Sequence, residues 1–322
     1  MHAGSFAISI VVGRVGGAFR HTPAWFAEQI TCGASVETSK ITIDRYTLEE
    51  RSSYSTTNYH HNLMTRIYTL VNQKGGVGKT TTAINLSAYL AHLGQRVLVV
   101  DLDPQANATS SVGIDKSGVQ GSTYEALLNL EVPASSLLYN ERLKFWLLPS
   151  SPALAGAEVE LVSELGREFR LRRALESQNG KYDYILIDCP PSLGILTVNG
   201  LVAAREGVLV PVQCEYLALE GLGQLTQTIE RVQSALFPEL RVRGVILTMF
   251  DPRTNLSMDV VKEVKNHFPG QVFESIVPRS IRLAEAPSYG LPISAYSPSS
   301  MGARAYEALA KELLQGDGVA VS

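Results

Sequence analysis

A glycine-rich turn between an apolar strand and a helix constrains this chain more than any other feature. The turn reads Lys-Gly-Gly-Val-Gly-Lys-Thr-Thr over residues 74–81. Ile67–Val71 before it is apolar enough for a buried strand, and Lys79–Leu93 after it has the apolar spacing of a helix. Gly94 is placed to end that helix. A strand, a glycine turn and a helix in this order are typical of α/β folds with parallel strands.

The rest of the chain continues the alternation of strands and helices. Further apolar strands are predicted at Val97–Val100, Tyr184–Ile187, Val208–Val212 and Val245–Met249. Helices are predicted at Ala157–Glu176, Leu222–Leu236 and Gly302–Leu314. We therefore expect an α/β fold with a doubly wound, mostly parallel sheet flanked by helices.

The regular pattern does not cover the whole chain of 322 residues. Residues 1–63 have no sustained period and are rich in Ser, Thr, Tyr and His, so we interpret them as a weakly ordered extension. A mis-assigned start codon, with Met64 as the first residue, is the alternative. Residues 64–315 are expected to form one domain, and residues 316–322 a flexible tail.

Composition excludes several classes of function. The formal net charge is −3, so any affinity for nucleic acid must come from a local patch. The chain has no run of about 18 apolar residues, and a membrane-spanning helix is not expected. Cys32, Cys189 and Cys214 are far apart and form no CxxC pair, which argues against a zinc or iron–sulfur site within one chain and fits a reducing cytoplasm.

The glycine turn predicts a phosphate site. Backbone N–H groups of such a turn converge on anions, and the helix N-terminus adds partial positive charge. Lys79 is placed to reach the terminal phosphates, and the Thr80 hydroxyl to bind Mg²⁺. Thr81 is placed to reach an α-phosphate. The predicted ATP-binding residues of the loop are Lys74, Gly75, Gly76, Val77, Gly78, Lys79, Thr80 and Thr81.

Three aspartates follow predicted strands, where side chains point into the ligand crevice of a parallel sheet. Asp188 comes directly after Tyr184–Ile187 and is expected to hold Mg²⁺ through a water molecule. Asp101 and Asp103 follow Val97–Val100. Asp101 is interpreted as a support for the magnesium site, and a purely structural role in capping the next turn stays open for both residues.

The loop departs from the common pattern G-x-x-x-x-G-K-[ST]. Gln73 occupies the first glycine position, and Lys74 adds a second lysine at the front of the loop. This deviant Walker A loop resembles the ParA/MinD class of P-loop NTPases. The resemblance implies that Lys74 acts in trans on the partner's nucleotide, so that the active form is an ATP-dependent homodimer.

Three further segments narrow the resemblance to the ParA/Soj family of chromosome and plasmid partitioning ATPases, over residues 65–314. They are Asp101–Ser110, Pro211–Gly221 and Val277–Pro292. The resemblance implies ATP hydrolysis that is slow and stimulated by a partner, with Lys74, Lys79 and Asp103 as catalytic residues. Asp103 would orient the attacking water.

The same resemblance implies contacts with the base and with DNA. Met249, Pro278 and Arg279 would lie near the adenine, and Arg253 and Arg282 would bind DNA without sequence preference. Seven Lys/Arg and four Asp/Glu between residues 241 and 282 agree with a basic patch. The implied partners are DNA and a ParB/Spo-type centromere-binding protein, and the implied location is the cytoplasm, on the nucleoid.

Three rival functions remain at this point. A MinD-like membrane-cycling regulator of the division site would need a basic amphipathic C-terminal helix, but residues 302–314 carry only two cations, balanced by two glutamates. A relative of nitrogenase reductase would need cysteines that bind a cluster. The third rival is a nucleotide switch without useful turnover.

Overall fold

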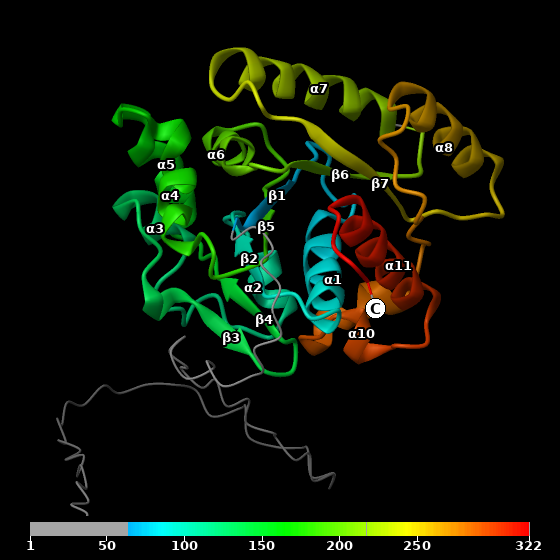
Figure 1. Cartoon of the computed structure of the whole chain (residues 1–322), viewed down its shortest axis with the longest axis horizontal. Coiled ribbons are helices and arrows are strands. Elements are labelled where there is room, and N and C mark those ends of the chain that lie inside the picture. Colours follow the sequence, from blue (N-terminus) through cyan, green and yellow to red (C-terminus); the bar gives the residue numbers. More distant parts are fainter. Residues whose placement is uncertain (1–63, 217, 322) are drawn as a thin grey trace, which may run out of the picture. The chain divides into compact units, whose positions relative to one another are not determined.

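A computed structural model describes residues 64–216 and 218–321, so the predicted N-terminal extension lies outside the described residues. Seven described strands form one sheet in the order β3-β4-β2-β5-β1-β6-β7 (Figure 1). All neighbouring strands are parallel except the edge pair β3–β4. The strands are β1 Arg66–Leu70, β2 Val97–Asp101, β3 Leu138–Asn140, β4 Phe145–Leu148, β5 Tyr184–Asp188, β6 Gly207–Gln213 and β7 Val242–Thr248.

Helices connect the strands and cover both faces of the sheet (Figure 1). They are α1 Lys79–His92, α2 Asn107–Ser111, α3 Thr123–Asn129, α4 Leu154–Glu160, α5 Arg170–Ala174, α6 Ile195–Ala203, α7 Ala218–Ala235, α8 Asn255–His267, α9 Ile281–Glu285, α10 Ile293–Tyr296 and α11 Met301–Gly316. The predicted doubly wound, mostly parallel α/β fold is confirmed.

Side chains of a strand alternate between the two faces, and this alternation separates the core into layers. In β2, Val97 and Val99 lie in the same apolar cluster as residues of α1 and α11. Leu98 and Val100 lie in the cluster of α3, α4 and α5 on the opposite face. A third cluster joins β6 and β7 to α6, α7 and α8. Every side chain of β2 is buried, as expected for an inner strand of a parallel sheet.

The strand order brings three chain segments together at the carboxyl edge of the sheet. β1 lies between β5 and β6, and Leu70 at its end is in register with Asp188 at the end of β5. Asp188 is also in register with Asp101 at the end of β2. The loop after β1 therefore begins beside the two strands that carry the predicted acidic residues.

The single helix predicted over Ala157–Glu176 is wrong. Here the chain forms α4, the short 3₁₀ turns Leu161–Ser163 and Arg167–Phe169, then α5 and a last 3₁₀ turn. Gly166 has φ +64°, a left-handed conformation that ends regular helix. Arg170 stabilises the break, because its guanidinium donates hydrogen bonds to the carbonyls of Leu127 and Leu128 in α3.

Asp317, which the sequence assigned to a flexible tail, is anchored in the structure. Its carboxylate accepts hydrogen bonds from the Tyr68 hydroxyl at 2.7 Å and the Tyr184 hydroxyl at 3.0 Å. Arg243 Nη2 lies 3.1 Å from the same carboxylate. The end of α11 is thereby fixed to the amino-terminal edge of the sheet. Asp317 is anchored there, whereas the sequence predicted a flexible tail from residue 316 onward.

Candidate nucleotide site

The loop after β1 is shaped by glycines and fixed by its neighbours. Gly76 and Gly78 have φ +73° and +90°, which residues with a side chain rarely adopt. The Thr248 hydroxyl at the end of β7 donates a hydrogen bond of 2.8 Å to the Val77 carbonyl. Asn72 Oδ1 accepts a hydrogen bond of 3.0 Å from the Lys74 N–H. The loop is thus held in place before any ligand arrives.

The N-terminus of α1 has no side-chain cap. Its N-cap residue is Gly78, so an anion that binds there would have no capping side chain to displace. The first N–H groups of a helix lack acceptors within the helix, and the helix dipole favours negative charge at this end. The geometry is therefore that of a phosphate site.

A cavity of about 410 Å³ opens in front of this helix end. Most of the predicted loop residues line it, together with Asp103 and Met249. The sequence analysis missed Asn107, Ser111 and Pro191, which also line it. Asn107 and Ser111 belong to α2; Asn107 lies in the segment Asp101–Ser110 and Ser111 directly follows it, so that segment was the signal available.

The Lys79 side chain lines this cavity, where its ammonium can neutralise the charge of a phosphate. Its side chain is 7% exposed, and its Nζ donates to the Lys74 carbonyl at 3.3 Å. Burial lowers the pKa of Lys79, while Asp188, Cys189 and Asp103 oppose that shift. A bound phosphate would supply the negative charge that this buried ammonium lacks.

The predicted magnesium residues lie in direct contact. Thr80 Oγ1 donates a hydrogen bond of 2.6 Å to Asp188 Oδ2. Asp188 is fully buried, and burial raises its pKa to about 8. Its Oδ1 has no hydrogen-bond partner, so one oxygen is left for a metal-bound water. These residues fit Mg²⁺. No group of three or more His, Cys, Asp or Glu that could hold a metal was found among the described residues.

Asp103 and Asp101 have different surroundings. Asp103 lines the cavity and accepts a hydrogen bond of 2.9 Å from the Gln105 N–H. Asp101 accepts hydrogen bonds from the N–H and hydroxyl of Thr109, at 2.8 and 2.7 Å. Burial raises the pKa of Asp101 to about 6. Asp101 therefore holds α2 against the sheet, a structural role different from the capping of the next turn that the sequence left open.

A second cavity of about 220 Å³ adjoins the first, with Gly78, Thr81 and Met249 lining both. Pro278 and Arg279, the predicted base contacts, line the second cavity. Residues that the sequence analysis missed also line it: Thr248, Val277, Ser280, Leu283, Ala284 and Tyr306. The two cavities together suit a phosphate chain followed by a flat base.

Met249 has a strained backbone at this junction. Its φ of +52° is uncommon for a residue with a side chain. This conformation ends β7 at Thr248, one residue earlier than predicted, and turns Met249 toward both cavities. Strain of this kind persists where the surrounding structure fixes it, often at ligand sites.

Of the predicted loop residues, Lys74 and Val77 are not among those that line either cavity. Its Nζ is 3.9 Å from Glu215 Oε2, and the side chain is 31% exposed. Arg279 Nη2 lies 2.6 Å from the other oxygen of Glu215. The Lys74 ammonium thus lies beside Glu215, while the Lys74 carbonyl accepts the hydrogen bond from Lys79 Nζ.

The two predicted DNA-binding arginines lie on adjacent segments. The Arg279 N–H donates to the Phe250 carbonyl at 3.0 Å, which ties the segment of Arg282 to the segment of Arg253. Both arginines are mostly exposed, and each pairs with a neighbouring carboxylate, Arg253 with Asp251 at 2.7 Å and Arg282 with Glu285 at 2.9 Å. The hydrogen bond from Arg253 lowers the pKa of Asp251 to about 2.

The cysteines offer no reactive or cluster-binding site within the described residues. Cys189 and Cys214 are both free and buried. Burial raises the pKa of each thiol, which keeps it protonated and unreactive. Cys32 lies outside the described residues. Among the residues described, no helix has the length and apolar character needed to span a membrane.

Comparison with known proteins identifies the family. Residues 65–242 match the family model described as an AAA domain. The chromosome partitioning protein ParA of Myxococcus xanthus is 54% identical over 253 residues, which cover 78% of this chain and 89% of that protein. The sporulation initiation inhibitor protein Soj of Bacillus subtilis is 50% identical over 78% of this chain and 98% of that protein. The chain belongs to the ParA/Soj family of chromosome-partitioning ATPases.

A solved structure agrees with the ParA/Soj fold seen here. Cobyrinic acid a,c-diamide synthase from Mycobacterium smegmatis, crystallised with ADP and magnesium, is 41% identical with a TM-score of 0.70. The match covers 79% of this chain and 96% of that protein. The predicted family and P-loop fold are therefore confirmed, while the roles of individual site residues stay predictions.

Proposed function

We propose that this chain binds ATP and Mg²⁺, dimerises around the nucleotide, and couples slow ATP hydrolysis to DNA binding in the partitioning of chromosome or plasmid origins. The single observation that carries the proposal is the position of Lys74. It is the extra lysine of a phosphate-binding loop, yet its ammonium lies 3.9 Å from Glu215 and the residue does not line the phosphate cavity. Residues 64–315 constitute the ATPase domain in this proposal.

The buried site of each subunit would bind the nucleotide and position it for hydrolysis. The N–H groups of the loop and the Lys79 ammonium hold the phosphates, and the two adjoining cavities orient the nucleotide with the base between Met249 and Pro278. Thr80 and Asp188 would hold Mg²⁺, and the metal would supply positive charge beside the phosphates. Asp103 lines the same cavity from the end of β2 and orients the attacking water.

The second subunit completes the site. A cation that arrives only on assembly stabilises the charge that develops on the transferred phosphoryl group, as an arginine finger does. Among the residues that the structure describes, the Lys74 ammonium pairs with the partly exposed Glu215, at 3.9 Å. Its release is inexpensive, because exposed ion pairs contribute about 0–1 kcal/mol. ATP hydrolysis would then remove the shared ligand and open the dimer.

Arg253 and Arg282 would bind DNA phosphates from the closed dimer. Each now pairs with a nearby carboxylate on the protein surface. A phosphate can replace such an exposed carboxylate at little cost, so binding would be independent of sequence and would weaken steeply with salt. A ParB/Spo-type partner would stimulate hydrolysis, and the protein would act in the cytoplasm on the nucleoid.

A MinD-like role at the membrane is the competing function. Its lipid-binding C-terminal helix would need a free apolar face. In α11, the apolar residues Leu309, Leu313 and Leu314 are buried in the cluster shared with α1. This burial supports the DNA proposal. ATP-dependent pelleting of the protein with liposomes of anionic lipid would contradict it.

The proposal is tested by comparing ATP with ADP. We expect a dimer by analytical ultracentrifugation only with ATP and Mg²⁺, and retention of non-specific double-stranded DNA by that dimer alone. Adding salt should lower the DNA affinity with a log–log slope of about −0.9 for each phosphate contacted. Equal DNA binding in ATP and ADP would refute the coupling. A monomer in both nucleotides would refute the shared site.

A further inference from the structure

The turn that joins β2 to α2 carries Asp103, the residue that the proposed function assigns to the attacking water. A hydrogen bond of 2.8 Å from the Ala106 N–H to the Asp103 carbonyl closes this turn. The Gln105 N–H donates a second hydrogen bond, of 2.9 Å, to Asp103 Oδ1. The direction of the Asp103 carboxylate therefore depends on the orientation of the Gln105 backbone.

Ala106 gives this turn a strained backbone. Its φ of +53° and ψ of +43° place it in the left-handed region, which residues with a side chain rarely adopt. Such a conformation persists where surrounding contacts hold it, often at functional sites. A change in φ at Ala106 would rotate the peptide group between Gln105 and Ala106. It would thereby break the hydrogen bond that closes the turn, because the Ala106 N–H belongs to this peptide group.

The side chain of Lys116 contacts this same peptide group. Its Nζ donates a hydrogen bond of 3.0 Å to the Gln105 carbonyl. Hydrogen bonds with a charged donor are stronger than those between neutral groups. The Gln105 backbone is thus held on both sides, with its N–H bonded to Asp103 and its carbonyl bonded to Lys116.

The loop after α2 is folded so that it presents Lys116 to the turn. Ile114 anchors the loop, because it packs against the apolar cluster shared by α1 and α11. Asp115 then forms a tight turn, in which its Oδ1 accepts from the Ser117 N–H at 2.9 Å and its carbonyl from the Gly118 N–H at 3.1 Å. The backbone on both sides of Lys116 is therefore fixed, and the lysine needs to order only its own side chain to reach Gln105.

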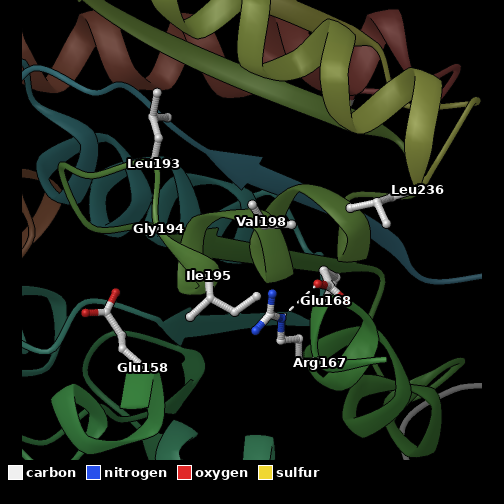
Figure 2. A pocket seen from close by; sticks show the side chains of 8 residues that line it. All are labelled: Glu158, Arg167, Glu168, Leu193, Gly194, Ile195, Val198 and Leu236. Carbon is white, nitrogen blue, oxygen red and sulfur yellow. Dashed lines mark hydrogen bonds and ion pairs between the residues drawn. The ribbon is translucent and has the colours of Figure 1, made fainter. Parts of the chain in front are cut away.

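The partner of Lys116 is a backbone carbonyl and not a carboxylate. Within residues 64–216 and 218–321, Lys116 forms no ion pair, although Asp115 is its neighbour in the chain. Figure 2 shows a different arrangement, in which Arg167 on the wall of a groove of about 500 Å³ pairs with Glu168 at 3.0 Å. The charge of Lys116 thus acts on the backbone of the turn that carries Asp103.

We propose that Lys116 is a positioning residue for ATP hydrolysis, which holds the Gln105 peptide group so that Asp103 faces the attacking water. Of the described residues, Lys116 is not among those that line the two nucleotide cavities, so it acts through the turn and not on the phosphates. It donates a hydrogen bond and transfers no proton. The inference rests on the proposed role of Asp103 and adds the residue that fixes the orientation of its carboxylate.

The test measures phosphate release, ATP affinity and ATP-dependent dimerisation of full-length variants. Lys116→Met keeps an apolar side chain but removes the donor, and it should lower kcat about tenfold with ATP affinity and the dimer unchanged. Lys116→Arg can still donate to the Gln105 carbonyl and should recover most of kcat. Lys181→Met makes the same change at an exposed lysine elsewhere and should behave as wild type. A loss of ATP affinity in Lys116→Met as large as the loss of kcat would overturn the inference.

A double-mutant cycle shows whether Lys116 acts through Asp103. Once the carboxylate is removed by Asp103→Ala, there is nothing left to position, so adding Lys116→Met should not lower kcat further. Losses of kcat that multiply would overturn the inference. So would a normal kcat in Lys116→Met when Asp103→Ala is slow. An unchanged kcat in Asp103→Ala itself would instead refute the proposed role of Asp103.

Hydrogen exchange provides a measurement that does not depend on turnover. The amides of Gln105 and Ala106 both donate within the turn, and both should exchange faster in Lys116→Met than in wild type. Amides of α1 should exchange at the same rate in the two proteins. Unchanged exchange at Gln105 and Ala106 would overturn the inference, because the turn would then be held without Lys116.

Discussion

Replacing Lys74 by alanine separates the stability of the monomer from the chemistry of the dimer. In the monomer the lysine contributes a partly exposed ion pair with Glu215 at 3.9 Å, and Arg279 keeps Glu215 paired at 2.6 Å. Exposed pairs of this kind are worth about 0.2–1 kcal/mol. We therefore expect Lys74→Ala to lower the free energy of unfolding by less than about 1 kcal/mol.

The expected effect on turnover is far larger. A cation delivered in trans to a transferred phosphoryl group is worth about 10³–10⁵ in kcat, or about 4–7 kcal/mol. ATP binding to the monomer should change little, because Lys79 and the loop N–H groups make the contacts within the chain. ATP-dependent dimerisation and DNA binding should be lost.

The assay combines urea unfolding without nucleotide, calorimetric ATP binding, sedimentation and phosphate release. Lys181→Ala, at an exposed position outside the cavities, is the matched control and should behave as wild type. Normal dimerisation and DNA binding by Lys74→Ala would refute the reasoning. A loss of ATP affinity in the monomer as large as the loss of turnover would show that Lys74 acts within its own chain.

Three further predictions concern other parts of the molecule. Arg253→Glu with Arg282→Glu should abolish DNA retention while sedimentation still detects the ATP dimer, and unchanged retention would place the patch elsewhere. Burial raises the pKa of Asp101 to about 6, so its contribution to stability is complete below about pH 4 and is lost as the pH rises through 6, about 3 kcal/mol in total. In Asp101→Asn, the urea midpoint of unfolding should depend less on pH between pH 4 and 6. An unchanged pH profile would assign the pH dependence to another group. Asp317→Ala removes the carboxylate that Arg243 and two tyrosine hydroxyls share and should cost about 3–5 kcal/mol by urea unfolding, whereas Lys311→Ala on α11 should cost under about 1 kcal/mol.

The sequence predicted the parts of the site that depend on local order. Thr80 follows Lys79 on α1, and Asp188 ends a fully buried strand, so their meeting follows from parallel strands that end at one edge. Strand ends and a glycine turn are short-range signals. That is why the phosphate cavity and the magnesium pair were both expected.

Other features depend on contacts between distant segments. Glu215 is 141 positions from Lys74, and no local pattern indicates that the two side chains meet. The break between α4 and α5 depends on Arg170, whose partners lie on α3. The edge strands β3 and β4 have only three and four residues, too short for a reliable period.

The ion pairs at Asp317 bring the start of β1 close to the end of α11. Arg66, the first residue of β1, donates a hydrogen bond of 3.0 Å to the Asp317 carbonyl. A linker of a few residues would therefore join these ends without disturbing either one, and the exposed turn at Pro238 and Glu239 offers a place to open the chain. The domain is thus suited to circular permutation, with β1 and α11 made contiguous and the nucleotide loop retained in the interior of the new sequence.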